Sequence, residues 1–184
     1  YVFDVLYMIY VPITSSMKRI ATRNANRMGR IRNSITRGQG NSYGFLGEQI
    51  TKLVLGGEIV NKGKKYNVDY DLVLDDGTTV EVKTKKTTVE PKKYYECSVA
   101  KYNTKQKCDY YAFVRVLDTK KGGWFLGVMP KEKYFINAKF LKAGTRDGDN
   151  GFLVRADCYN LPISDLQRNI WGMGRLKTRP RRIK

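Results

Sequence analysis

The chain has 184 residues, which is enough for one domain with a sizeable core, and 41% of its residues are apolar, as in an ordinary globular protein. Its 35 Lys and Arg residues outnumber 17 Asp and Glu, and the resulting net charge of +18 indicates a polyanionic partner. The sequence holds no histidine, which excludes imidazole catalysis, including that of His-Asn-His nucleases, and its three cysteines form no Cys-x-x-Cys pair that would favour structural zinc.

The N-terminal residues 1–41 are predicted to form a segment with a basic arm. The opening stretch YVFDVLYMIYVPI is too short for a membrane-spanning helix and lacks the basic lead of a signal peptide, so a strand and no membrane partner are expected. A helix is expected from Met17 to about Thr36. It carries mostly arginine, which suits phosphate binding, and the arm's candidate nucleic-acid contacts are Arg19, Arg23, Arg27, Arg30, Arg32 and Arg37.

A core domain is predicted over residues 42–167. Its first element is a helix in which Phe45, Ile50, Leu53 and Val54 form an apolar face and the Gly56-Gly57 pair supplies the stop. The hydrophobic period then changes towards two. Strands are expected near 58–61, at 70–85 as a hairpin, at 94–100, from 110, from about 122, and after 152; short helices or turns are expected at 101–107, near 130 and near 165. This order predicts an α/β domain with a mixed sheet.

The hairpin loop sets which residues face each other. A three-residue loop, Asp75-Asp76-Gly77, has glycine where a left-handed conformation is needed. With Leu74 opposite Thr78, the register brings Asp71 opposite Glu81, with Cβ atoms about 5 Å apart. A two-residue loop would shift the register by one, and the two carboxylates would then lie on different faces.

Two adjacent carboxylates on a sheet are destabilising unless a cation neutralises them. Mg²⁺ (or Mn²⁺) suits such a pair, because it is bound through one or two carboxylates together with phosphate oxygens. Lys83 lies on the same face as Glu81, where it can offset charge on a reacting phosphate. The spacing also fits a plain solvent-exposed hairpin with acids and lysines on its wet face.

This Asp, Glu-x-Lys pattern resembles the PD-(D/E)XK nuclease superfamily, which includes restriction enzymes, Holliday-junction resolvases and homing endonucleases. The resemblance covers residues 42–118 and implies a restriction-endonuclease-like core, a central mixed sheet flanked by helices, with basic N- and C-terminal arms. It implies that Asp71 and Glu81 bind metal and that Lys83 is catalytic. Glu48 stands where the family's helical glutamate would be, as a further catalytic residue. Tyr70 replaces the family's usual proline, and Asp69 competes with Asp71 for its role.

The family often has a polar residue after the third core strand. Here Lys105 or Gln106 would fill that position, and a solvated turn is the alternative.

The implied function is a Mg²⁺-dependent DNA endonuclease acting on duplex or branched DNA as a homodimer or higher homo-oligomer. A cytoplasmic, phage or mobile-element enzyme is expected. Residues 168–184 form a basic C-terminal tail, whose candidate nucleic-acid contacts are Arg175, Lys177, Arg179, Arg181 and Arg182. The alternative is a non-catalytic basic nucleic-acid-binding protein, and no residue excludes ribonuclease action.

Overall fold

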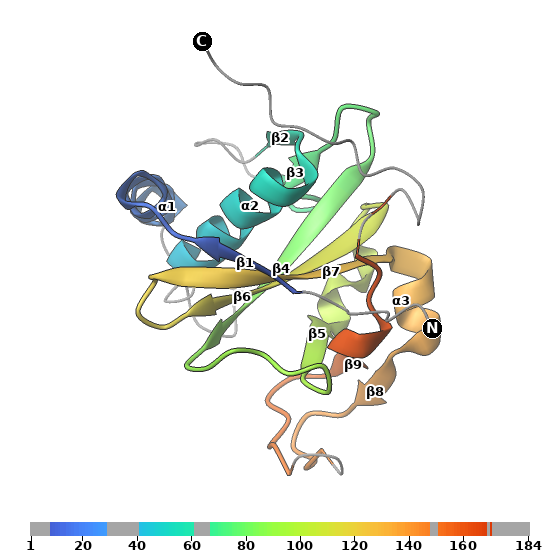
Figure 1. Cartoon of the computed structure of the whole chain (residues 1–184). Coiled ribbons are helices and arrows are strands. Elements are labelled where there is room, and N and C mark those ends of the chain that lie inside the picture. The colour runs from blue at the N-terminus through green and yellow to red at the C-terminus, as the bar shows by residue number, and fades with distance from the viewer. Residues whose placement is uncertain (1–7, 29–40, 61–66, 148–150, 169, 171–184) are drawn as a thin grey trace, which may run out of the picture.

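The computed structural model describes residues 8–28, 41–60, 67–147, 151–168 and 170. A six-stranded sheet with the order β1-β7-β6-β4-β3-β2 runs through the centre (Figure 1). Its strands are β1 (Ile9–Pro12), β2 (Glu58–Ile59), β3 (Leu72–Val73), β4 (Thr79–Thr87), β6 (Tyr110–Leu117) and β7 (Gly122–Pro130). Strands β4 and β6 are parallel and the other neighbours are antiparallel, so the predicted α/β class with a central mixed sheet is confirmed.

Two helices, α1 (Ser15–Met28) and α2 (Asn41–Leu55), cover one face of this sheet (Figure 1). The face of α2 that carries Phe45, Leu46 and Ile50 packs on one side of the sheet, where Val80 and Val114 are fully or almost fully buried. Such burial of an apolar helix face is the main source of stability for a helix of this length.

A second, three-stranded sheet with the order β5-β9-β8 lies over the opposite face. It consists of β5 (Glu96–Ala100), β8 (Lys139–Leu141) and β9 (Cys158–Pro162), accompanied by η1 (Lys101–Lys105), α3 (Lys131–Asn137) and η2 (Ile163–Asp165). Tyr111 and Phe113 of β6 point to this side, whereas Ala112 and Val114 point to the helices. Strand β6 is therefore buried on both faces, which explains why its sequence is apolar at every position except Arg115.

Most elements expected from the sequence are present within the described residues; the part of the expected N-terminal helix after Met28 lies outside them, and β8 was not expected. Leu53, predicted on the apolar face of the first core helix, is 65% exposed, and Leu46 is buried instead. The sequence did not predict that β5, β8 and β9 leave the main sheet and form their own. Cys97, Cys108 and Cys158 are free thiols and the first two are buried, as expected for core residues.

The N-terminal segment contains the expected strand, β1, and the start of the expected basic helix, α1, and both elements pack onto the fold. Strand β1 pairs with β7, and Met17 and Ala21 of α1 are buried in the core. The side-chain amide of Gln49 on α2 also donates a hydrogen bond to the carbonyl of Met17 (3.1 Å). Residues 9–28 therefore belong to the packed fold, because the edge of β7 and the exposed side of α2 provide surface for them. No helix within the described ranges is long and apolar enough to cross a membrane.

Helix α2 approaches β4 closely at one glycine. A Cβ atom added to Gly47 would lie 1.9 Å from Oγ1 of Thr84, whereas a Cβ on Gly44, one turn earlier, would meet nothing within 4 Å. Only a residue without a side chain permits this helix–strand distance. The same contact sets the depth of Glu48, the next residue along.

We predict that Gly47→Ala lowers the free energy of unfolding by about 1–3 kcal/mol, because the added methyl group forces α2 away from β4. Urea denaturation measures this change. Gly44→Ala is the matched control, which should be neutral or stabilising by up to about 1 kcal/mol through its helix propensity. Equal effects of the two substitutions would contradict the close approach at Gly47.

Candidate active site

The hairpin between β3 and β4 has the predicted three-residue loop. Gly77 adopts a left-handed conformation with φ of +85°, and the N–H of Leu74 donates to the carbonyl of Thr78 (2.9 Å). The pairs Leu72–Val80 and Val73–Thr79 follow, so the register predicted from the turn is confirmed over both residues of β3. The alternative two-residue loop is excluded.

Asp71 lies immediately before β3 and is held against β4. Its N–H donates to the carbonyl of Val80 (3.0 Å), and its Oδ2 accepts a hydrogen bond from the N–H of Val82 (2.9 Å). The side chain thus takes a position that the backbone carbonyl would occupy in a regular ladder. This arrangement brings the carboxyl group beside Glu81, whose negative charge contributes to the raised pKa of Asp71.

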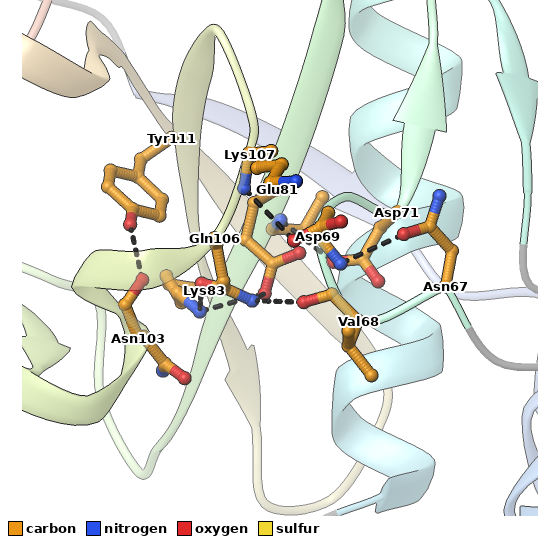
Figure 2. A network of polar contacts seen from close by, with 11 residues as sticks. Asn67, Val68, Asp69, Asp71, Glu81, Lys83, Asn103, Gln106, Lys107 and Tyr111 are labelled. Carbon is orange, nitrogen blue, oxygen red and sulfur yellow. Dashed lines mark hydrogen bonds and ion pairs between the residues drawn. The ribbon is translucent and has the colours of Figure 1, made fainter.

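Glu81 and Lys83 project from the same side of β4 and form an ion pair. The Nζ of Lys83 lies 2.8 Å from Oε1 of Glu81 and 2.9 Å from Oε1 of Gln106 (Figure 2). The amide Nε2 of Gln106 in turn donates to Oε1 of Glu81 (2.8 Å) and to the carbonyl of Val68 (2.9 Å). The three side chains form a closed hydrogen-bonded ring, which fixes both the carboxylate and the ammonium group.

Gln106 is therefore the polar residue that joins the site from beyond the hairpin. Its backbone carbonyl also accepts a hydrogen bond from Nζ of Lys131, whereas Lys105, the other candidate, is exposed at the end of η1. The solvated turn expected as an alternative does not apply to Gln106. Its place follows from the parallel pairing of β4 with β6, because η1 immediately precedes β6 and ends beside Glu81.

Asp69, the competitor of Asp71, has a different role. Its Oδ1 accepts a hydrogen bond from the N–H of Lys107 (3.1 Å), and its own N–H donates to Oδ1 of Asn67 (2.9 Å). These contacts join the loop before β3 to the segment after η1 (Figure 2). Asp69 thus links two loop segments beside the site, and Asp71 supplies the carboxylate next to Glu81.

Glu48 reaches the same region from α2. Its side chain is only 7% exposed, and its Oε2 is buried with no hydrogen-bond partner among the described residues. Burial raises the pKa of Glu48 well above its ordinary value, and the negative charges of Asp71 and Glu81 raise it further. The pKa of Asp71 is also raised well above its ordinary value, first by burial and then by Glu81.

The structure thus brings together all four residues that the sequence singled out as catalytic: Glu48, Asp71, Glu81 and Lys83. Sequence analysis missed Tyr111, whose ring lies 5.5 Å from Nζ of Lys83 and whose hydroxyl donates to the carbonyl of Asn103 (3.2 Å). Tyr111 pairs with Glu81 across the parallel β4–β6 ladder, which is a long-range register that no local pattern reveals.

A hard divalent cation fits the oxygen ligands of this cluster. Asp71 and Glu81 offer two adjacent carboxylates, and the orphaned Oε2 of Glu48 is a buried acceptor with uncompensated charge nearby. Over the described ranges, no group of three or more Asp, Glu, Cys or His side chains is close enough to enclose a metal by itself. Two carboxylates with water and phosphate completing the shell are the usual arrangement for Mg²⁺.

The predicted nucleic-acid contacts fall partly within the structure. Arg19, Arg23 and Arg27 are exposed at four-residue spacing along α1 and so share one side of the helix. The remaining predicted contacts lie outside the described residues: Arg30, Arg32, Arg37, Arg175, Lys177, Arg179, Arg181 and Arg182.

No known protein-family model matches this chain, and no curated protein sequence is significantly similar to it.

The raised pKa values predict an unusual pH dependence of stability. Because the folded state holds protons on Glu48 and Asp71 more tightly than the unfolded state, their contribution to the free energy of unfolding is lost as pH rises from about 4 through the raised values. Removing the buried charge should therefore stabilise the metal-free protein at higher pH.

We predict that metal-free Glu48→Gln gains on the order of 1 kcal/mol relative to the wild type between about pH 4 and about pH 8. Denaturant unfolding at several pH values measures this difference. Asp75→Asn, which removes an exposed charge from the hairpin loop, is the control and should show no such gain. If the free energy of unfolding of Glu48→Gln fell relative to that of the wild type as pH rises, this result would contradict the repulsion among the carboxylates.

Proposed function

We propose that this chain is a Mg²⁺-dependent (or Mn²⁺-dependent) endonuclease that hydrolyses phosphodiester bonds in DNA. One observation carries the proposal: the carboxylates of Asp71 and Glu81 lie together at the end of a hairpin, with Nζ of Lys83 2.8 Å from Glu81. The local resemblance to the PD-(D/E)XK nucleases supports the same reading of these residues, and a restriction-endonuclease-like fold belongs to the proposal. A purely structural hairpin would not need two neighbouring acids, one of them buried.

Asp71 and Glu81 would hold the cation, with Glu48 as a further acceptor behind them. When bound, Mg²⁺ supplies Lewis-acid polarisation of a phosphate oxygen and lowers the pKa of an attacking water. Lys83 donates hydrogen bonds towards charge that develops on the phosphate as the water oxygen bonds to phosphorus and the ester oxygen leaves. Gln106 positions Lys83 through the 2.9 Å contact, so its role is to orient rather than to react.

The proposal that DNA is the substrate is based on the positive charge of the chain. The net charge of +18 and the exposed arginines of α1 favour a polyanion, and the rest of the basic surplus includes the predicted contacts outside the described residues. Cleavage of both strands of a duplex requires two such sites, so a homodimer is part of the proposal. Its expected location is the cytoplasm of a cell or of a phage-infected host.

We predict that Asp71→Asn and Lys83→Met each lower Mg²⁺-dependent cleavage by about a hundredfold or more, because each removes a group that acts on the reacting phosphate. Plasmid, four-way-junction, single-stranded DNA and RNA substrates are assayed with Mg²⁺ and with EDTA. The matched controls are Asp75→Asn and Lys86→Met, which remove the same charges at exposed positions of the same hairpin.

Full activity of the Asp71→Asn protein would refute the proposed site. Binding of nucleic acid without turnover on any substrate would favour the non-catalytic alternative. Cleavage confined to RNA would retain the site and replace the substrate.

Cation binding is also testable without turnover. A ligand that binds only the folded state raises the free energy of unfolding, by about 2.7 kcal/mol at about 100 times its Kd. We predict that Mg²⁺ raises the thermal unfolding midpoint of the wild type and of Asp75→Asn but not that of Asp71→Asn. The rise should be larger at about pH 8 than at about pH 6, because the carboxyls with raised pKa must lose their protons to bind metal. An equal rise in all three proteins would place the cation elsewhere.

A further inference from the structure

The polar face of β4 continues beyond the proposed active site. Because side chains alternate along a strand, Glu81, Lys83 and Lys85 project from the same face, with successive members about 7 Å apart. On the neighbouring strand β6, Arg115 is the direct partner of Lys85 in the parallel ladder. The cationic side chains of Lys85 and Arg115 therefore lie side by side, two residues further along β4 than Lys83.

Both cations contact neutral groups on β5. The Nζ of Lys85 donates to Oγ of Ser98 (2.7 Å) and to the carbonyl of Glu96 (3.2 Å). The Nη2 of Arg115 donates to the same carbonyl (3.1 Å), and its guanidinium lies 5.1 Å from the ring centroid of Tyr95. Lys85 and Arg115 thus converge on one point while the Lys85 side chain stays exposed to solvent.

No carboxylate within the described part of the chain forms an ion pair with either residue. A nearby acid, Glu96, has its carboxylate hydrogen-bonded to Nδ2 of Asn160 (2.6 Å). The Nε of Arg115 is buried and has no hydrogen-bond partner among the described residues.

Like charges directly opposite each other in a sheet are destabilising, so this pair costs the folded protein free energy unless an anion is present. The two residues lie on the same face as the proposed catalytic residues and at a spacing comparable with that of successive phosphates on a polynucleotide strand. An exposed Lys side chain beside an Arg guanidinium suits a phosphodiester, whose negative charge is shared by two oxygens.

We propose that Lys85 and Arg115 form a subsite for the phosphodiester adjacent to the one that is cleaved, so that the strand being cut runs along β4. This inference rests on the proposed nuclease function and adds to it the path of the substrate. Ser98 and the carbonyl of Glu96 hold the two side chains in place in the absence of nucleic acid.

The test is the salt dependence of binding, which does not require turnover. Fluorescence anisotropy with a labelled DNA duplex is measured over a series of KCl concentrations, with Asp71→Asn as the background. Lys85→Gln should weaken binding and reduce the slope of log K against log[salt] by about 0.9, the effect of one lost phosphate contact. Lys86→Gln is the matched control, since Lys86 is an exposed lysine on the opposite face of β4, and its slope should stay near that of the background.

A second measurement locates the contact. Duplexes that carry one uncharged methylphosphonate linkage next to the cleaved bond should be cut more slowly than the unmodified duplex by the wild type. The Lys85→Gln protein should cut both duplexes at the same reduced rate, because the partner of that phosphate is already absent.

A purely structural role predicts other results. If Lys85 only ties β5 to the main sheet, Lys85→Gln and Ser98→Ala should lower the thermal unfolding midpoint alike, and neither should change the slope more than Lys86→Gln does. That outcome would overturn the subsite. Should Lys85→Gln fail to fold, the same slope measured on Arg115→Gln decides the question. Failure of the wild type to cut any polynucleotide would refute the nuclease function by itself, independently of the slopes.

Discussion

Repulsion among buried carboxylates is the constraint on which the rest of this structure depends. Burial and the neighbouring negative charges raise the pKa values of Glu48 and Asp71, and Lys83 forms an ion pair with Glu81. An arrangement of this kind persists only when the surrounding fold opposes its relaxation. The close contact of Gly47 with Thr84 and the ladder between β4 and β6 provide that rigidity.

Strand β4 contributes residues both to the hydrophobic core and to the proposed active site. Val80 and Val82 on one face belong to the core beneath α2, whereas Glu81, Lys83 and Lys85 on the other face point towards the second sheet and η1. A strand buried on both faces would ordinarily carry apolar residues throughout, as β6 does except at Arg115. The polar residues on one face of β4 mark the side of the sheet where we place the cation, the phosphate that is attacked and the adjacent phosphodiester. Further along the same face of β4, the two positive charges of Lys85 and Arg115 repel each other, just as the negative charges of Asp71 and Glu81 do.

The parts of the site that the sequence predicted correctly depend on short-range geometry. Gly77 sets the loop type, the loop sets the register of two residues of β3, and alternation along the strand sets the face of Lys83. Gln106 was one of two equal candidates, because nothing in its neighbourhood says how η1 meets β4. Asp71 was preferred to Asp69 because it directly precedes the apolar strand and faces Glu81, and the structure adds their different partners, the N–H groups of Val82 and Lys107.

The sequence by itself determined the α/β class and the hairpin register that places Asp71 opposite Glu81, because turn chemistry and side-chain alternation act over a few neighbouring residues, whereas Glu48 was proposed from the family resemblance. Tertiary structure alone decided that β1 and α1 join the core, that β5, β8 and β9 form a separate sheet, that Leu53 is exposed, and that Lys85 lies beside Arg115. These outcomes depend on which distant surfaces bury the most apolar area together, and a local pattern carries no information about its distant partner.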